Sequence, residues 1–199
     1  MTDASSTVLS QQLVQVRQRT KLFELRNQYE LLDMAGQPIG AVEQVRQNPL
    51  AMLSRVFSDL DVMLPVELEL RGPNGVELVL HKPWFRMATS VRDAAGGDIG
   101  VIRKQIRMGK ARFGLFDATG TPCGEVRAQN WRARDFAVLD TTGREVGRVT
   151  KRWAGFAREM FTDADHYAIE LGADLHDPLR SLALASSFAI DLVLKQKDT

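Results

Sequence analysis

The last apolar stretch of the chain, LRSLALASSFAIDLVL at Leu179–Leu194, decides the fold. Asp177 and Pro178 come directly before it, an arrangement typical of the cap and first position of a helix. Its sixteen residues extend only about 24 Å as a helix, whereas a membrane-spanning helix needs about 20 residues. Apolar and small residues occur on every side, so the helix must be buried inside protein. We therefore expect no transmembrane span.

Upstream of this helix, one pattern of turn residues occurs four times: an Asp, a Gly three residues later and a second Gly seven residues later. The Asp carboxylate can accept hydrogen bonds from nearby backbone amides, and the first Gly supplies the positive φ that a tight reversal needs. The pattern predicts four β-hairpins, at Asp33/Gly36/Gly40, Asp93/Gly96/Gly100, Asp117/Gly120/Gly124 and Asp140/Gly143/Gly147. A fifth hairpin is predicted in ELELRGPNGVELVL, residues 67–80.

About five or six hairpins supply about ten to twelve strands, and a barrel of that size is too wide for its own side chains to fill. A buried helix would fill it, as in closed β-cans built around one helix. The sequence therefore predicts a mainly β fold, a closed antiparallel barrel of about twelve strands around the buried C-terminal helix. The helix residues of its core would be Leu182, Leu184, Phe188, Ile190, Leu192 and Leu194.

Two segments, residues 1–9 and Pro49–Leu60, fall outside the hairpin pattern. Residues 1–9 are expected to form a flexible N-terminal tail, and residues 10–199 a single barrel domain. Within that domain, Pro49–Leu60 has apolar residues at steps of three and four. This spacing predicts a short amphipathic helix that covers the sheet.

The charge of the chain is unevenly distributed along the sequence. Its 199 residues have a net charge of +1, but Arg103–Arg158 contains thirteen basic and five acidic residues. The remainder contains thirteen basic and twenty acidic residues, so a polarised surface is expected. A single cysteine, Cys123, excludes an intrachain disulfide and favours a reducing, cytoplasmic location.

The stretch GRVTKRWAGFAREMFTDADHYAIEL, residues 147–171, resembles the phospholipid scramblase family, as does the FAIDLVL ending of the last helix. The segments NQYELLDMAGQPIGAVEQ, residues 27–44, and HKPWFRMATSVRDAAGGDIG, residues 81–100, are similar to the first two hairpins of that family. The likeness covers roughly residues 10–196. It implies the Tubby-like barrel, shared with LURP-one-related proteins, in which twelve strands surround a C-terminal helix. It also implies association with membranes and lipids.

The segment DADHYAIELGAD corresponds to the calcium loop proposed for the family, and calcium is the one cofactor that the resemblance implies. The carboxylates would come from Asp163, Asp165 and Asp174, although calcium takes six to eight oxygen ligands. The alternative is a half-buried strand with acidic ends, because the apolar residues of HYAIEL alternate. In addition, Ala168 stands where a helix–loop–helix calcium site needs Gly.

Basic residues without an intervening acidic residue follow the second of the four hairpin turns, and others occur in later hairpins. Adjacent hairpins could bring them together on one wall, where each would contribute about 1 kcal/mol to binding anionic membrane lipid. The alternative is an ordinary solvated strand face. The predicted lipid-binding residues are Arg103, Lys104, Arg107, Lys110, Arg112, Lys151 and Arg152, with Arg127 among the basic residues that follow.

No catalytic or zinc-binding motif such as GxSxG, HExxH or CxxC occurs in the sequence, and lipid scrambling makes no covalent bond. The resemblance therefore implies a non-catalytic, lipid-associated barrel at the inner face of the membrane that assists phospholipid scrambling. A barrel filled by its own helix, however, offers no path for headgroups. Two alternatives stay open: a regulatory module that binds protein or nucleic acid through its basic surface, and an enzyme or small-ligand carrier.

Overall fold

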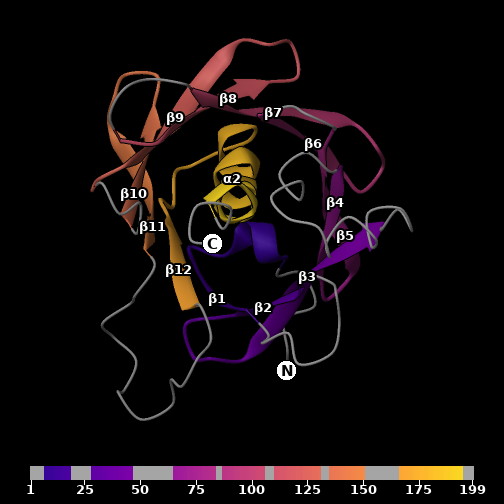
Figure 1. Cartoon of the computed structure of the whole chain (residues 1–199). Helices are drawn as coiled ribbons and strands as arrows, with labels where there is room; N and C mark the ends of the chain where they lie inside the picture. The colour runs from indigo at the N-terminus through magenta and orange to yellow at the C-terminus, as the bar shows by residue number, and fades with distance from the viewer. Residues whose placement is uncertain are drawn as a thin grey trace, which may run out of the picture.

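The computed structural model describes residues 7–18, 28–46, 65–83, 87–105, 110–130, 135–150 and 166–194. Twelve strands in these parts of the chain form one closed antiparallel ring, and helix α2 lies inside it (Figure 1). The predicted fold class is confirmed. The expected helix at Pro49–Leu60 lies outside the described residues.

The described elements follow one another around the ring in sequence order. In chain order they are η1 (Val8–Ser10), β1 (Leu13–Gln18), β2 (Gln28–Leu32), β3 (Pro38–Arg46), β4 (Val66–Gly72), β5 (Gly75–Lys82), β6 (Ala88–Asp93), β7 (Asp98–Gln105), β8 (Arg112–Asp117), β9 (Pro122–Ala128), β10 (Asp135–Asp140), β11 (Glu145–Thr150), β12 (His166–Leu171) and α2 (Leu179–Leu194).

The ring closes where β1 pairs with β12, its partner at the far end of the strand order. Val14 faces Ile169 and Val16 faces Tyr167 across this seam, and all four side chains are buried. Every other described strand pairs with its neighbours in the sequence. Residues close in the sequence therefore stay close around the wall.

The two ends of the barrel differ. In the described residues, five short turns gather at one end, the hairpin end, where they join β2–β3, β4–β5, β6–β7, β8–β9 and β10–β11. Helix α2 begins there, with Leu179 beside Gly124. It runs to the opposite end, where the Phe188 ring lies 5.5 Å from the Tyr29 ring and 6.3 Å from the Tyr167 ring between centroids.

All four Asp-Gly turns form as predicted. Each Asp carboxylate accepts hydrogen bonds at 2.8–3.0 Å from the backbone amides two and four residues later. The first Gly of each pattern has φ between +76° and +87°, and its amide donates to the Asp carbonyl. The fifth predicted hairpin, β4–β5, is also confirmed.

The second Gly of each pattern has a role that the pattern did not predict. Each lies opposite the residue at which the strand register shifts, and a methyl group there would come within 2.7 Å of a neighbouring backbone carbonyl. At Gly124 the methyl would also lie 2.7 Å from Leu179 Cδ1, and at Gly100 3.1 Å from Leu182 Cδ1. These two glycines make room for the first turns of α2.

Helix α2 is buried on all sides. Every residue of Ser181–Ile190 is buried, and the hydroxyls of Ser186 and Ser187 each donate to a carbonyl of the preceding turn at 2.7 Å. This satisfies the polar groups that burial would otherwise penalise. Leu192 and Leu194 belong to α2, but their side chains lie outside the described part. The predicted core residues confirmed as buried are Leu182, Leu184, Phe188 and Ile190.

The bounds of α2 agree with the predicted segment, although Pro178, expected at the first helical position, comes just before the helix. The helix begins at Leu179, and Asp177 Oδ1 accepts hydrogen bonds from the Ser181 amide at 3.0 Å and the Ser181 hydroxyl at 2.6 Å. A carboxylate that binds amides of the first turn stabilises a helix N-terminus. Asp177 therefore still caps the helix.

The 3-10 helix η1 closes the hairpin end, so residues 7–9 differ from the flexible tail expected at residues 1–9. Residues 1–6 lie outside the described part of the chain. Val8 is only 1% exposed, and the Glu77 carboxylate accepts hydrogen bonds from the amides of Val8 and Leu9 at 3.0 and 3.1 Å. From the first turn of α2, the Arg180 guanidinium donates to the carbonyls of Leu9, Gln11, Gly172 and Leu175. Apolar burial and these bonds hold residues 7–10 in the barrel.

Phe188→Ala should destabilise the fold strongly, because it leaves a cavity where the ring contacts Tyr29 and Tyr167. We expect a loss of about 3–5 kcal/mol, which lowers Tm by about 6–20 °C in a thermal melt followed by circular dichroism. Phe116→Ala is the matched control, because that ring is only half-buried on the outer wall. An equal loss in both variants would contradict the central role of α2.

Thr119→Ala should raise the pKa of Asp117. The Thr119 hydroxyl donates to Asp117 Oδ1 at 2.6 Å and, with the amides of Thr121 and Thr119, holds the pKa of that carboxyl below its ordinary value. The stability this contributes is present above the unfolded pKa and is lost as pH falls through the folded pKa. An NMR titration should show the rise at Asp117 and none at Asp140, which has its own bond from Thr142. Identical titration of Asp117 in both proteins would contradict this assignment.

Candidate functional site

Arg103 and Lys104, which are neighbours in the basic run, point to opposite faces of β7. Ile102 and Lys104 pair with Leu115 and Phe113, which are buried, so Lys104 belongs to the inward set. Arg103 pairs with Gly114 on the outer set and is exposed. The outer surface therefore gains Arg103 and not Lys104, because successive strand residues point to opposite faces.

Three neighbouring strands carry arginines on their outer face near the opposite end of the barrel. Arg103 lies on β7, and Arg112 on β8 pairs directly with Arg127 on β9. Lys110, exposed just before β8, donates to the Gln129 carbonyl. We call these four residues the basic wall. Of the other predicted lipid-binding residues, Arg107, Lys151 and Arg152 lie outside the described part of the chain.

The charges of the basic wall are only partly satisfied. Arg127 forms an ion pair with Glu125 on its own strand, but its Nε is buried and finds no hydrogen-bond partner among the described residues. Arg112 forms no ion pair within the described ranges. Like charges directly opposite each other destabilise a sheet, so the Arg112–Arg127 pair carries a cost that, among the described residues, the Arg127–Glu125 ion pair offsets only in part.

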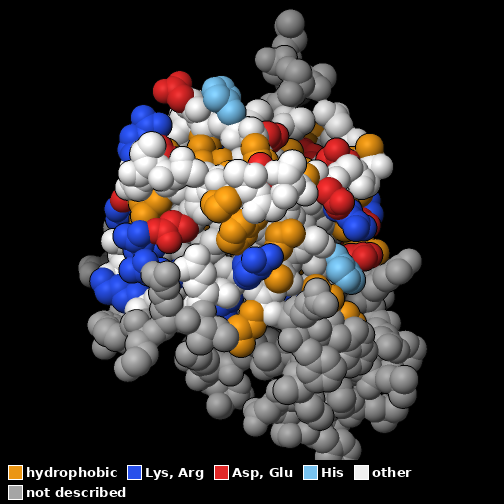
Figure 2. Space-filling view, turned by 90° about the horizontal axis from the view of Figure 1, so that it is seen from above, with side chains coloured by type: hydrophobic (Ala, Val, Ile, Leu, Met, Phe, Trp, Pro, Cys, Tyr) orange, Lys and Arg blue, Asp and Glu red, His pale blue; other side chains and the backbone are white. Residues whose placement is uncertain are grey.

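An apolar patch adjoins the basic wall. Val101 pairs with Phe116 on the outer face of β7 and β8, and Pro122 of β9 also pairs with Phe116. The Arg103 guanidinium lies 4.8 Å from the centre of the Phe116 ring, a cation–π contact. Figure 2 shows hydrophobic side chains in the middle of the face over β7–β9, with basic side chains beside them. The basic run alone did not predict the contribution of Phe116.

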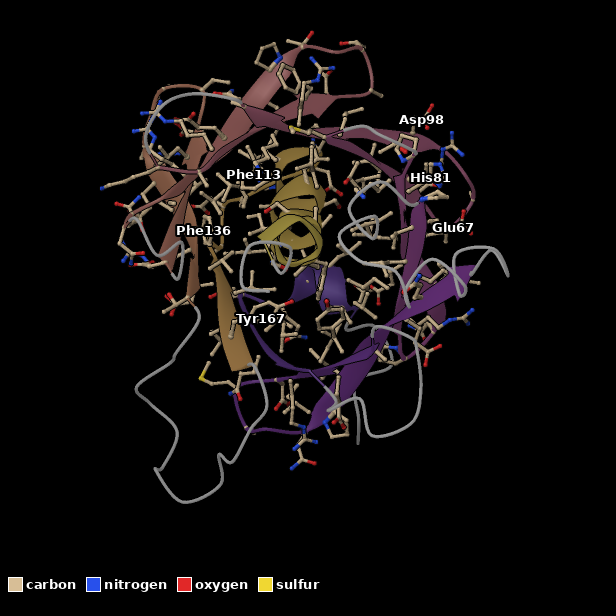
Figure 3. All side chains as sticks on the ribbon, in the orientation of Figure 1. Glu67, His81, Asp98, Phe113, Phe136 and Tyr167 are labelled. Atoms are coloured by element: carbon tan, nitrogen blue, oxygen red, sulfur yellow. The ribbon has the colours of Figure 1, made fainter. Side chains whose placement is uncertain are left out.

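The strands on the other side of the barrel carry acidic residues outward. Glu43 on β3 pairs directly with Glu69 on β4. Two negative charges therefore face each other here, as two positive charges do in the arginine pair of β8 and β9. Figure 3 shows Glu67 and His81 outside the ring, whereas Phe113, Phe136 and Tyr167 lie inside. His81 Nδ1 lies 3.7 Å from the Glu67 carboxylate. We call the outward carboxylates of β2–β4 the acidic wall: Glu30, Glu43, Glu67 and Glu69.

The uneven charge of the sequence thus appears as two walls on different parts of the ring. The basic wall lies on β7–β9 and the acidic wall on β2–β4, with two strands between them on one side of the ring and four on the other. A meander keeps sequence neighbours together, so the described basic residues Arg103, Lys110, Arg112 and Arg127 lie on or beside three adjacent strands. On β1–β4, however, Arg17 pairs with Glu30 and Arg71 with Glu69, so the acidic wall is partly neutralised and the predicted polarity of the whole surface stays a prediction.

A polar layer lines the interior near the opposite end. Gln44, Lys82 and Thr89 are each 4% exposed, and Lys104 extends the layer onto β7. Burial lowers the pKa of the Lys82 ammonium. Gln44, Lys82 and Lys104 each have an interaction within the chain. The layer therefore belongs to the packed interior.

The predicted calcium residues are not brought together by the described structure. Asp163 and Asp165 lie outside the described residues, and Asp174 is exposed in the turn after β12. His166–Leu171 forms a strand, as the alternative predicted, and it rises about 17 Å. Within the described ranges no group of three metal-binding side chains converges. Calcium binding stays a prediction.

The single cysteine is half-buried and its thiol donates to the Leu115 carbonyl. Burial raises the pKa of the Cys123 thiol, and the charge of Asp117 raises it further. Cys123 is therefore a poor nucleophile at neutral pH. Separately, no helix in the part of the chain described here is long and apolar enough to span a bilayer.

A closed barrel around a C-terminal helix, with oppositely charged walls, defines the architecture, and the comparisons with known proteins define the family. The sequence profile of the Scramblase family matches residues 2–195. The chain therefore belongs to the Scramblase family.

The curated relatives match over a shorter segment. Phospholipid scramblase 1 of Mus musculus is 38% identical over 52 residues, which is 26% of this chain and 16% of that protein. Phospholipid scramblase 2 of Homo sapiens is 38% identical over 52 residues, 26% of this chain and 18% of that protein. The matched segment thus covers less than a fifth of these relatives.

A solved structure supports the fold over nearly the whole chain. The X-ray structure of a protein from Arabidopsis thaliana superposes with a TM-score of 0.51 at 12% identity, covering 94% of this chain and 92% of that one. At this identity the likeness shows the fold alone.

Arg112→Glu should stabilise the protein, because it replaces a like-charge pair with an opposite-charge pair to Arg127. We expect a gain of about 0.5–1 kcal/mol, or about 1–4 °C in Tm, measured by thermal melts at low salt. The gain should shrink in 1 M salt, where charges are screened. A lower Tm would contradict the pairing, and Arg112→Gln should give a smaller gain.

Proposed function

We propose that this protein binds anionic membrane lipid through the basic wall and the adjoining apolar patch, and assists phospholipid redistribution there. The observation that carries the proposal is the set of Arg103, Arg112 and Arg127 on three adjacent strands beside Phe116. Membership of the Scramblase family supports a role connected with lipid scrambling. We assign this role to the basic wall and the adjoining apolar patch.

The outer wall suits this role better than the interior. Every residue of Ser181–Ile190 is buried against the barrel, so α2 and the strands fill the space that a lipid headgroup would need. On the outer wall, arginines can pair with phosphate or carboxylate groups while an aromatic ring sits at headgroup depth. Scrambling through this surface would require no covalent chemistry.

The expected strength of binding is modest. Each basic residue near an anionic leaflet contributes about 1 kcal/mol, so four residues give reversible attachment that weakens with salt. The cytoplasmic leaflet is the anionic one in cells, which agrees with the peripheral location expected from the sequence. Calcium dependence remains a prediction. Vesicle flotation with added calcium and with a chelator tests it.

Vesicle flotation tests the proposal, with phosphatidylcholine vesicles compared to vesicles that also contain phosphatidylserine. We expect binding to the anionic vesicles only, and a reduction of about fivefold for Arg103→Gln and for Arg112→Gln. The matched control is Arg92→Gln, because Arg92 is also an exposed strand arginine but lies on β6 and pairs with Asp98 at 2.8 Å. Its binding should equal that of the unmodified protein.

Two outcomes would overturn this function. Equal or negligible binding to both kinds of vesicle would remove the lipid partner, and equal losses in Arg92→Gln and Arg103→Gln would remove the assigned surface. A fluorescent-lipid quench assay in vesicles, run on the same variants, then measures redistribution. Unchanged redistribution in variants that no longer bind would separate that activity from the basic wall.

A further inference from the structure

We propose that copies of this protein associate head to tail, the basic wall of one against the acidic wall of the next. The partner is a second copy of the chain, whose charges complement those of the first. Glu43 faces Glu69 across β3 and β4, and Arg112 faces Arg127 across β8 and β9. Each like-charge pair is unfavourable in its own sheet. Glu69 is already paired with Arg71 and Arg127 with Glu125, so the charges that a second copy would chiefly balance are those of Glu43 and Arg112.

The two pairs match in spacing. Residues directly opposite in an antiparallel pair have Cβ atoms about 4.5–5.5 Å apart, so two carboxylates and two guanidinium groups are presented at the same separation. Guanidinium and carboxylate groups form paired, charge-assisted hydrogen bonds. Two parallel contacts, Glu43 with Arg112 and Glu69 with Arg127, can therefore form together between two copies.

The neighbours of each pair extend the match. Arg71 forms an ion pair with Glu69 on β4, and Glu125 forms one with Arg127 on β9. When Glu69 meets Arg127, the four side chains alternate in charge along one row. Glu43 and Arg112 form no ion pair within the described residues, so both are available for the contact.

The positions of the walls decide the form of the assembly. Their central strands, β3 and β8, lie five positions apart in a ring of twelve, so the two walls face in largely opposite directions. A copy that uses its acidic wall leaves its basic wall open to a third copy, which is a head-to-tail contact that builds rows. Exposed ion pairs change an association constant only a few-fold each, so the association is weak and strongest at low salt.

Sedimentation velocity over a concentration series tests the proposal, using Glu43→Lys and Arg112→Glu. The unmodified protein should show a sedimentation coefficient that rises with concentration at low salt and stays constant at high salt. Each variant alone should associate at least tenfold more weakly, because its two walls then carry partly matching charge. An equimolar mixture of the two variants should associate again. Both substitutions convert a like-charge pair into an opposite-charge pair, so loss of folding is not expected, and thermal melts verify this.

Three results would overturn the proposal: no concentration dependence in the unmodified protein at low salt, undiminished association in either variant, or no recovery in the mixture. The inference shares the basic wall with the proposed lipid site but fails independently of it. Glu43→Lys changes only the acidic wall, so it should lose self-association and keep its binding to anionic vesicles. Arg103→Gln should weaken vesicle binding and leave the association largely intact.

Discussion

The burial of helix α2 inside the strand ring is the constraint on which the rest of the structure depends. A helix that is apolar on all sides cannot face water, and twelve strands enclose more space than their own side chains fill. The helix fills the space inside the ring, and the ring shields the helix from water. Arg180, in the first turn of α2, donates to the carbonyls of residues in and directly after η1 and of residues that link β12 to α2. The helix therefore also holds η1 and the β12–α2 link in place.

This packing moves function to the outside of the barrel. Phe188 and its neighbours occupy the interior, and the lipid binding that we propose therefore uses the outer wall. Arg103 and Phe116 show how the surface combines charge with an aromatic ring. The like-charge pairs on the two walls are unfavourable in the isolated chain, and the partner that we propose would bring opposite charge to each of them.

Much of the fold could be predicted from the sequence, because its signals are local. The Asp-Gly turns depend on carboxylate and backbone geometry within five residues, and α2 shows its burial in its own composition. The second glycines were harder, since the need for space at Gly124 comes from Leu179, which is far away in the chain. Lys104 was predicted to lie on the lipid-binding surface, because the basic run does not show which of its residues face inward. Only the pairing of Lys104 with the buried Phe113 shows that it belongs to the inward set. The capture of Val8 by Glu77 likewise depends on a contact between distant residues.

The most direct test of this account is hydrogen exchange at the backbone amides of Ser181–Ile190, measured with and without bound anionic vesicles. The account places the helix inside the barrel in both states, so these amides should exchange only through global unfolding and keep the same protection when vesicles bind. Loss of that protection on vesicle binding, while the strand amides remain protected, would show that the helix leaves the barrel and would contradict the account.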